Sequence, residues 1–222
     1  MQVHAMFNRI AFTYDRMNRL MTAGFDRAWR QEIIRLANLK PDMQVLDLGT
    51  GTGDLAWLVF NEVPEISVTA ADFSLAMMLE GRKRGNLPFV SADALSAPFA
   101  DGSFDIVMSG FLLRNTADLD QALKEQHRLL KPGGQVVVLD TTRPVQNPLT
   151  PFIWLHMHLI IPALGWLVSG DRKAYIYLSD SSEHFLSAEE LAEQMTSAGF
   201  VEVGFKRRMA GTIAIHWGRK TS

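Results

Sequence analysis

The sequence predicts an α/β protein with a doubly wound, mostly parallel, seven-stranded Rossmann-like sheet, a C-terminal antiparallel hairpin and a helical lid insertion. Three observations predict it. Short apolar runs alternate with helical patterns along the chain, the order typical of a parallel sheet covered by helices. The first apolar run, 45–48, opens onto three closely spaced glycines and then a helical pattern. Two alternating segments, 200–205 and 212–217, flank a Met-Ala-Gly turn and end the chain as a hairpin.

Apolar spacing and turn residues place the remaining elements in order. Helical spacing indicates helices over 1–38, and Ser74 is a good N-cap for the helix after the second strand. Lys-Pro-Gly-Gly at 131–134 ends a later helix, and Ser187 with Glu190 forms a capping box that starts another. The strands expected after the first are 68–71, 89–91, 106–109 and 135–140, and the later helices begin at 75, 117 and 188.

Length and composition bound the answer. At 222 residues the chain holds one α/β domain over 1–222, in which we expect an N-terminal helical cap at 1–40 and an apolar lid insertion at about 146–180. A formal net charge of −2 gives no general basic surface, so nucleic acid is not expected as a partner. The absence of cysteine excludes disulfides and thiolate metal sites. No secretory or transit segment is recognisable, so we expect a cytoplasmic protein.

The glycine-rich turn after the first strand is the strongest functional signal. Side chains at these glycines would keep the backbone away from a ligand, and the next strand delivers a carboxylate that can take both ribose hydroxyls of a nucleoside. The alternative is a turn that only joins strand to helix. The pattern Asp-x-Gly-x-Gly-x-Gly resembles motif I of class I S-adenosylmethionine (SAM) methyltransferases. The cofactor-binding residues predicted here are Asp47, Gly49, Gly51, Thr52, Gly53 and Asp72.

Further polar residues follow the third and fourth strands. In open parallel sheets ligands collect beyond the carboxyl ends of the strands, so Asp93 and Ala94 are placed to meet the adenine. The alternative is an exposed loop aspartate. After the fourth strand comes Gly110, and then Arg114 and Asn115, a cation and a carboxamide suited to bind or polarise an oxygen. The alternative for Arg114 is a structural ion pair with a nearby carboxylate.

The segment 149–168 is apolar at nearly every position. Its length alone would allow a membrane span, but its prolines and histidines and the further strands after it favour a helical lid over the pocket. The outer apolar face of such a lid can touch the bilayer surface. An ordinary core helix is the alternative. Its two histidines, His156 and His158, lack an evident carboxylate partner, so no metal site is expected.

With these residues in view, the chain resembles the ubiquinone/menaquinone biosynthesis C-methyltransferase family over nearly its whole length. The matching stretches are MFNRIAFTYDRMN, VLDLGTGTGDLA, ADFSLAMM, APFADGSFDIV, LRN, LKPGG, YIYLSDSSEHF, EELAEQMTSAGF and GTIAIHWGRK. The resemblance implies transfer of a methyl group from SAM to a ring carbon of a prenylated hydroquinone, either demethylmenaquinol or a ubiquinone precursor. It places SAM against Thr52, Asp72, Asp93, Ala94 and Gly110, and Tyr14, Arg114 and Asn115 against the ring.

The chain departs from the family pattern at two places. The family usually has Phe-Gly-Leu-Arg-Asn where this chain has Phe-Leu-Leu-Arg-Asn at 111–115, and Leu-Glu-Phe-Ser-x-Pro where it has Leu-Asp-Thr-Thr-Arg-Pro at 139–144. We expect both changes to lie on the acceptor side of the pocket. They leave the SAM half unaffected and bear on the identity of the acceptor.

Because SAM brings its own leaving group, the protein mainly has to hold the methyl group, the sulfur and the nucleophilic carbon in line. A hydroquinone carbon becomes nucleophilic when a neighbouring hydroxyl loses its proton, so oxyanion donors or a base raise the rate. Arg114 and Asn115 suit the role of oxyanion donor, and Asp15, His156 or His158 suits the role of base.

The alternative functions for the protein are a methyltransferase of another lipid or phenolic metabolite, or an inactive SAM-binding scaffold of a membrane biosynthetic complex. A homo-oligomer or such a complex is compatible with the sequence.

Overall fold

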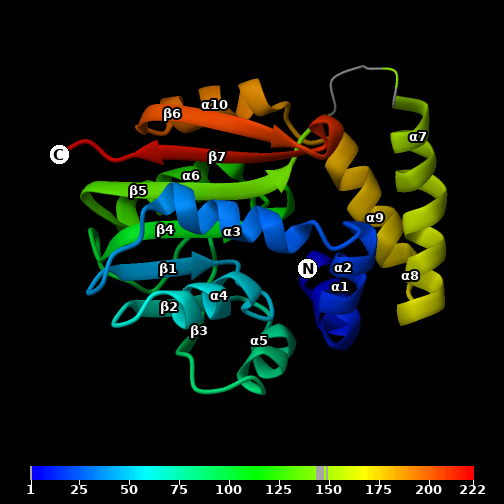
Figure 1. Cartoon of the computed structure of the whole chain (residues 1–222), viewed down its shortest axis with the longest axis horizontal. Coiled ribbons are helices and arrows are strands. Elements are labelled where there is room, and N and C mark those ends of the chain that lie inside the picture. The colour runs from blue at the N-terminus through cyan, green and yellow to red at the C-terminus, as the bar shows by residue number, and fades with distance from the viewer. Residues whose placement is uncertain (1, 144–147, 149) are drawn as a thin grey trace.

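The computed structural model describes residues 2–143, 148 and 150–222 (Figure 1). Residues 146, 147 and 149 of the predicted lid insertion lie outside this range. Seven strands form one sheet in the order β3-β2-β1-β4-β5-β7-β6. The strands are β1 Gln44–Leu48, β2 Ser67–Asp72, β3 Phe89–Ser91, β4 Phe104–Gly110, β5 Leu130–Thr141, β6 Val201–Arg208 and β7 Ile213–Arg219.

The predicted fold class is confirmed by the strand directions. The first five strands pair in parallel, whereas β7 pairs antiparallel with both β5 and β6. The order reverses between β1 and β4, and in doubly wound sheets ligands bind beyond the carboxyl ends of the strands at such a point. The helices are α1 Gln2–Ile10, α2 Tyr14–Met21, α3 Asp26–Ala37, α4 Asp54–Glu62, α5 Leu75–Arg82, α6 Leu119–Leu129, α7 Thr150–Leu155, α8 Ile161–Ser169, α9 Arg172–Glu183 and α10 Ala188–Ser197.

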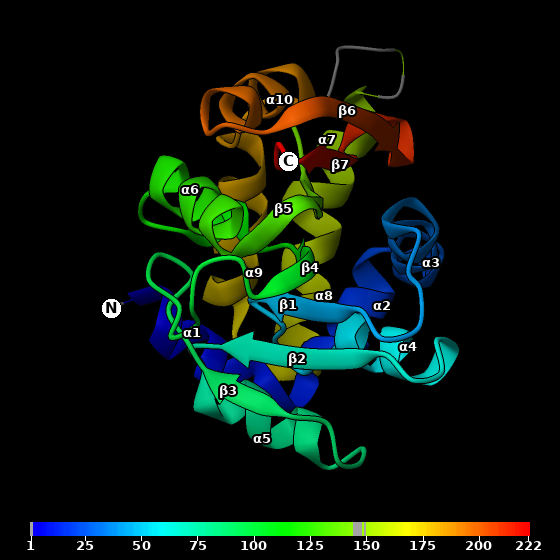
Figure 2. The ribbon, with the colours of Figure 1, turned by 90° about the vertical axis from the view of Figure 1, so that its left-hand side faces the viewer.

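Helices cover both faces of the sheet, and the strand residues alternate between the two layers (Figure 2). In β5, Val137 and Leu139 join the core formed with α3 and α4, while Val136 and Val138 join the core formed with α6 and α10. Because every second residue enters a different apolar layer, the strand must be apolar throughout, as the run 135–140 is.

A third apolar cluster holds the N-terminal helices against α8 and α9. Met6, Ile10 and Met17 from the N-terminal part pack with Tyr175 of α9, and all four are almost fully buried. Figure 1 shows these helices at the end of the sheet where the parallel strands terminate. They therefore cap the side of the sheet on which ligands of this fold collect.

Two element predictions were incomplete. β5 begins at Leu130, where a turn was expected through 131–134, because Leu130 pairs with Phe104 of β4. An added Cβ at Gly134 would lie 2.9 Å from the Lys131 carbonyl oxygen, so the backbone passes too closely there for any side chain. No separate helix was predicted over 172–183, yet α9 forms and lies against α8, where an added Cβ on Gly165 would meet the Tyr175 ring at 2.2 Å.

Candidate active site

The glycine-rich turn needs glycine for two reasons. Gly49, Gly51 and Gly53 all have positive φ angles, of 69°, 59° and 84°, a conformation that other residues rarely adopt. An added Cβ at Gly49 would also lie 2.6 Å from Cδ1 of Leu112, so the turn packs directly on that side chain. The expectation that Leu112 lies on the acceptor side was therefore wrong: its side chain lies against the glycine-rich turn.

Asp47 holds this turn together. Its Oδ2 accepts hydrogen bonds from the Thr50 hydroxyl at 2.6 Å and from the Ala56 amide at 3.1 Å. The residue is 1% exposed, and burial raises the pKa of its carboxyl to about 6. These contacts tie the end of β1 to the turn and to the start of α4.

Asp72 lies at the end of β2, next to the same turn. One carboxylate oxygen accepts from the Gly51 amide and the other from the Ser74 amide, each at 2.7 Å. Burial raises the pKa of Asp72. The carboxylate is thus held beside the glycine backbone, and Asp72 lines neither of the two cavities at this end of the sheet.

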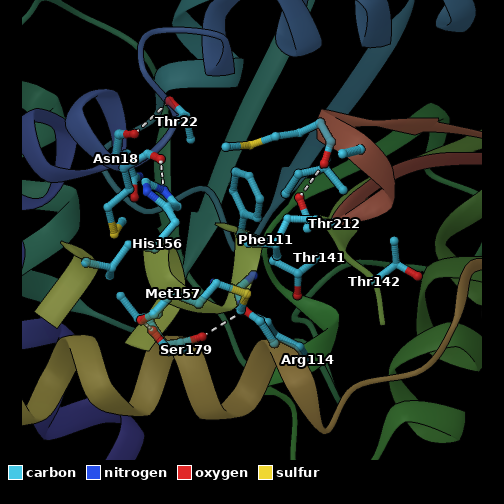
Figure 3. Close-up of a pocket in the computed structure, with 18 of the residues that line it drawn as sticks. Asn18, Thr22, Phe111, Arg114, Thr141, Thr142, His156, Met157, Ser179 and Thr212 are labelled. Carbon is cyan, nitrogen blue, oxygen red and sulfur yellow. Dashed lines mark hydrogen bonds between the residues drawn. The ribbon is translucent and has the colours of Figure 1, made fainter. Parts of the chain in front are cut away.

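Two cavities lie at this end of the sheet. The smaller, of about 30 Å³, borders the turn and the end of β4 and is lined by polar groups and backbone. The larger, of about 320 Å³, is mostly apolar (Figure 3). Phe111, whose φ of 61° is unusual for a large residue, lines both. The lining of the smaller includes Tyr14, Arg30, Gly49, Gly51, Thr52 and Gly110, and that of the larger Asn18, Arg114, Thr141, Thr142, His156 and Met157.

Arg114 is fixed in the wall of the larger cavity. Its Nη1 donates to Asp140 Oδ1 at 2.7 Å, and the two side chains are 6% and 1% exposed. The guanidinium also lies over the Phe111 ring, 5.2 Å from its centroid. Its Nε has no partner among the residues the structure describes. Arg114 therefore forms the structural ion pair that was the alternative from the sequence, and it also keeps a donor that could bind an oxygen.

Asn115 points elsewhere. Its amide nitrogen donates to the Phe111 carbonyl at 2.9 Å, and its amide oxygen accepts from the Tyr177 hydroxyl at 3.3 Å. The residue lines neither cavity. It holds the 3₁₀ turn Leu113–Asn115 that presents Arg114.

The N-terminal candidates lie over the glycine-rich turn. Tyr14 is half-buried and lines the smaller cavity, and burial raises the pKa of its hydroxyl. Asp15 accepts from the Thr52 hydroxyl at 2.5 Å and pairs with Arg84 at 2.6 Å. Asp15 does not line the larger cavity, so its contacts tie α2 to the turn.

The two residues predicted to meet the adenine, Asp93 and Ala94, lie apart from the cavity that Gly110 lines. Asp93 is exposed, and its carboxylate accepts from the Leu95 amide at 2.9 Å within its own loop. Neither Asp93 nor Ala94 lines either cavity, whereas Gly110 lines the smaller. An added Cβ at Gly110 would meet no heavy atom within 4 Å, so the backbone there borders open space.

The lid histidines also differ. His156 lines the larger cavity, and its Nε2 lies 3.0 Å from the Met21 carbonyl oxygen. His158 stacks on Trp154 and lies 3.3 Å from Glu183, outside that lining. Within 2–143, 148 and 150–222, no group of three His, Cys, Asp or Glu is arranged to hold a metal ion.

Several lining residues are not among the site candidates predicted from the sequence, and Arg30, Thr141 and Thr142 are examples. Arg30, which pairs with Asp26 at 2.5 Å and reaches the smaller cavity, carries only the signal of an i, i+4 ion pair. Thr141 and Thr142 stand where the chain departs from the family pattern, and both line the larger cavity. The departure at 139–144 therefore places two residues in the wall of the larger cavity.

The site therefore combines the glycine-rich turn, with the Asp72 carboxylate beside it, and an apolar cavity that has the buried Arg114 guanidinium in its wall. Open space beside Gly51 and Gly110, where added Cβ atoms would meet little, suits the close approach of SAM to the backbone. Solved structures of low identity share the fold. One is a SAM-dependent methyltransferase, possibly a histamine N-methyltransferase, from Thermotoga maritima, 23% identical over 98% of this chain and 99% of that one, with a TM-score of 0.70. Another is the [4+2]-cyclase SpnF, 20% identical over 99% of this chain and 96% of that one, with a TM-score of 0.71.

Fold and site together define a SAM-dependent methyltransferase. The model of the ubiE/COQ5 methyltransferase family matches residues 1–220, and the chain belongs to that family. It is 46% identical to the ubiquinone/menaquinone biosynthesis C-methyltransferase of Desulfotalea psychrophila, over 98% of this chain and 90% of the relative. It is 40% identical to the demethylmenaquinone methyltransferase of Thermus thermophilus, over 96% of this chain and 99% of the relative.

Proposed function

We propose that this enzyme transfers the methyl group of SAM to a ring carbon of a prenylated hydroquinone, demethylmenaquinol or a ubiquinone precursor. The observation that carries the proposal is the pairing of a large, mostly apolar cavity with one buried arginine, separated from the glycine-rich turn by Phe111. An isoprenoid-substituted ring needs apolar walls, and its hydroxyl needs a donor. The named activities of the relatives support the same acceptor class.

The cofactor half uses the residues around the turn. SAM, when bound, supplies an activated methyl group and leaves as a neutral thioether. The residues proposed to hold it are the glycines at 49, 51 and 53 with Thr52, Asp72 and Gly110, and the loop at 93–94 is proposed to meet the adenine. Tyr14 and Asp15 close α2 over the turn, since Asp15 contacts Thr52 directly.

In the acceptor half, Arg114 stabilises negative charge on the ring oxygen. Its Nη1 is held by Asp140, which leaves the N–H groups of Nε and Nη2 without a partner among the described residues. A charged donor of fixed geometry in an apolar cavity stabilises a phenolate strongly, because little solvent competes with it. The ring carbon next to that oxygen then becomes nucleophilic toward the methyl group.

His156 is the base that best fits the cavity. The Met21 carbonyl can only accept, so the 3.0 Å contact requires His156 Nε2 to carry the proton in the neutral ring. Nδ1 then has a free lone pair to take the hydroquinone proton. Asn115 positions Arg114 through the 3₁₀ turn, and Asp15 positions α2.

The lid is proposed to bring the enzyme to the membrane surface, where prenylated quinols reside. One helical stretch among the described residues, Thr150–Ser169, is apolar and long enough to cross a bilayer, and 17% of its window is buried. Only Pro162 and Gly165 of α7, α8 and the π-helical turn between them are buried, so an ordinary core helix does not fit. The exposed apolar side chains of this stretch are Phe152, Trp154, Leu155, Leu159, Ile160, Trp166 and Leu167.

The same lid also lines the acceptor cavity. Ile153, His156 and Met157 face the cavity, while Trp166 and Leu167 are 65% and 75% exposed. Contacts to the domain hold it in place, since the Ser179 hydroxyl donates to the Met157 carbonyl at 2.7 Å. A helix that contacts lipid on one side and the ring on the other lets the tail stay in the bilayer during methylation.

Methyl transfer from labelled SAM into quinols tests the proposal. Purified enzyme with liposomes containing reduced demethylmenaquinone or a ubiquinone precursor should yield a lipid-soluble product heavier by one methyl group. Phosphatidylethanolamine liposomes and a simple catechol serve as competing acceptors. Label that enters those acceptors and not the quinols would overturn the proposal.

A further inference from the structure

One hydroxyl in the acceptor cavity has no partner. Thr141 lines the cavity, and its Oγ1 is buried without a hydrogen-bond partner among the described residues. The other threonines of the lining differ: the hydroxyls of Thr22, Thr142 and Thr212 donate to the carbonyls of Asn18, Leu186 and Met209 at 2.8, 3.2 and 2.9 Å. A buried hydroxyl without a partner destabilises the fold, and a hydrogen bond to a bound acceptor would offset that loss.

Thr141 is held next to Arg114 by a shared acceptor. Oδ1 of Asp140 accepts from the Arg114 guanidinium at 2.7 Å and from the Thr141 backbone amide at 2.8 Å. Figure 3 shows both side chains on the same side of the cavity. Arg114 Nε also lacks a partner in the described part of the chain. Arg114 and Thr141 therefore place unused donors at neighbouring positions of the cavity wall, whereas a third unused donor of the lining, Nδ2 of Asn18, lies elsewhere in it (Figure 3).

We propose that Thr141 is a specificity-determining residue whose hydroxyl donates to the same acceptor-ring oxygen that the Arg114 guanidinium contacts. The inference rests on the proposed function and deepens it, because it assigns the acceptor an oxygen bound by two donors beside the methylated carbon. The family pattern has Phe at this position, which cannot donate. This chain thus replaces an apolar contact with a hydrogen bond on the acceptor side.

A second donor has two consequences. It favours the ionised form of the bound ring hydroxyl, so activity reaches its plateau at a lower pH. It also discriminates against rings that lack the oxygen, because the hydroxyl would then stay unpartnered. Removing one neutral hydrogen bond of about 1.4 kcal/mol corresponds to about a tenfold change in rate.

The test compares Thr141→Val, Thr141→Ser and the control Thr196→Val. Thr196 of α10 carries a hydroxyl that donates to the Ala192 carbonyl at 2.9 Å, and it does not line the cavity. For each protein we would measure kcat/KM for a prenylated hydroquinone across pH, SAM affinity by calorimetry and the melting temperature without ligands. Thr141→Val should lower kcat/KM about tenfold, move the rise in activity to higher pH, and leave SAM affinity and melting unchanged. Thr141→Ser should restore most of the activity.

Three outcomes would overturn the inference while the proposed function stands. They are a Thr141→Val enzyme within twofold of the parent, a Thr141→Ser enzyme as slow as the valine variant, and a valine variant that melts several degrees lower and loses SAM affinity. The last would assign Thr141 a structural role. A parent enzyme that methylates no hydroquinone would overturn the proposed function itself, and the inference with it.

Discussion

Replacing Arg114 with alanine and, separately, with lysine separates its structural role from its catalytic role. Alanine leaves Asp140, which is 1% exposed, with backbone donors only: the Thr141 amide at 2.8 Å and the Arg114 amide at 3.3 Å. Breaking a buried ion pair by removing one partner costs about 3–5 kcal/mol. Lysine keeps a cation near Asp140 but has no Nε–H and no planar fork. We therefore expect alanine to lower both stability and turnover, and lysine to lower turnover chiefly.

The expected size of each effect follows from the burial of the pair. Loss of one oxyanion-type donor lowers turnover by about 10²-fold or more, and both variants should show this loss. SAM affinity should stay within about threefold, a change of less than about 1 kcal/mol, since Arg114 does not line the smaller cavity. Urea unfolding reports stability, and single-turnover transfer from labelled SAM reports chemistry.

A nearby exposed pair supplies the control. Arg143 pairs with Glu190 at 2.9 Å, and their side chains are 52% and 45% exposed, so Arg143→Ala should cost at most about 1 kcal/mol. The reasoning fails if Arg114→Ala is no more destabilising than this control. It also fails if Arg114→Lys turns over as fast as the parent.

Three further predictions concern other parts of the molecule. Burial raises the pKa of the Asp47 carboxyl to about 6, so the folded protein keeps this proton to a higher pH than the unfolded chain does. The free energy of unfolding therefore falls as pH rises through about 6. Asp47→Asn removes this ionisation, so between pH 4 and pH 7 its free energy of unfolding, measured in urea, should rise relative to that of the parent by up to about 3 kcal/mol. Asp72→Ala should weaken SAM binding by roughly 1.5–3 kcal/mol, and an unchanged calorimetric affinity would remove Asp72 from the site. The double variant Trp166→Glu, Leu167→Glu should no longer sediment with liposomes or methylate long-tailed quinols, because each charge costs a few kcal/mol at a lipid contact. It should still bind SAM and methylate a short-tailed analogue. Leu79→Glu, at an exposed leucine outside the lid, is the control, and full liposome binding by the double variant would contradict the membrane contact.

The sheet, its hairpin and the glycine-rich turn can be predicted from the sequence. These depend on local signals: apolar runs, caps such as Ser74 and the Ser187 capping box, and glycines whose positive φ angles no other residue readily adopts. The family motifs likewise indicate Arg114 as a site residue. Such features can be read from neighbouring residues because neighbouring residues cause them.

Which polar groups contact one another depends on how distant segments pack. Asp140 becomes the ion-pair partner of Arg114, twenty-six positions away in the sequence, because β5 lies beside β4. Thr141 is brought near Arg114 because its amide donates to the same Asp140 oxygen. Asn115 turns toward Phe111 and Tyr177, and His156, not His158, enters the cavity because the lid crosses α9 with one side inward. Side-chain direction at a site depends on packing between distant segments, which the local pattern does not contain. The unpartnered hydroxyl of Thr141 is therefore visible only in the folded chain.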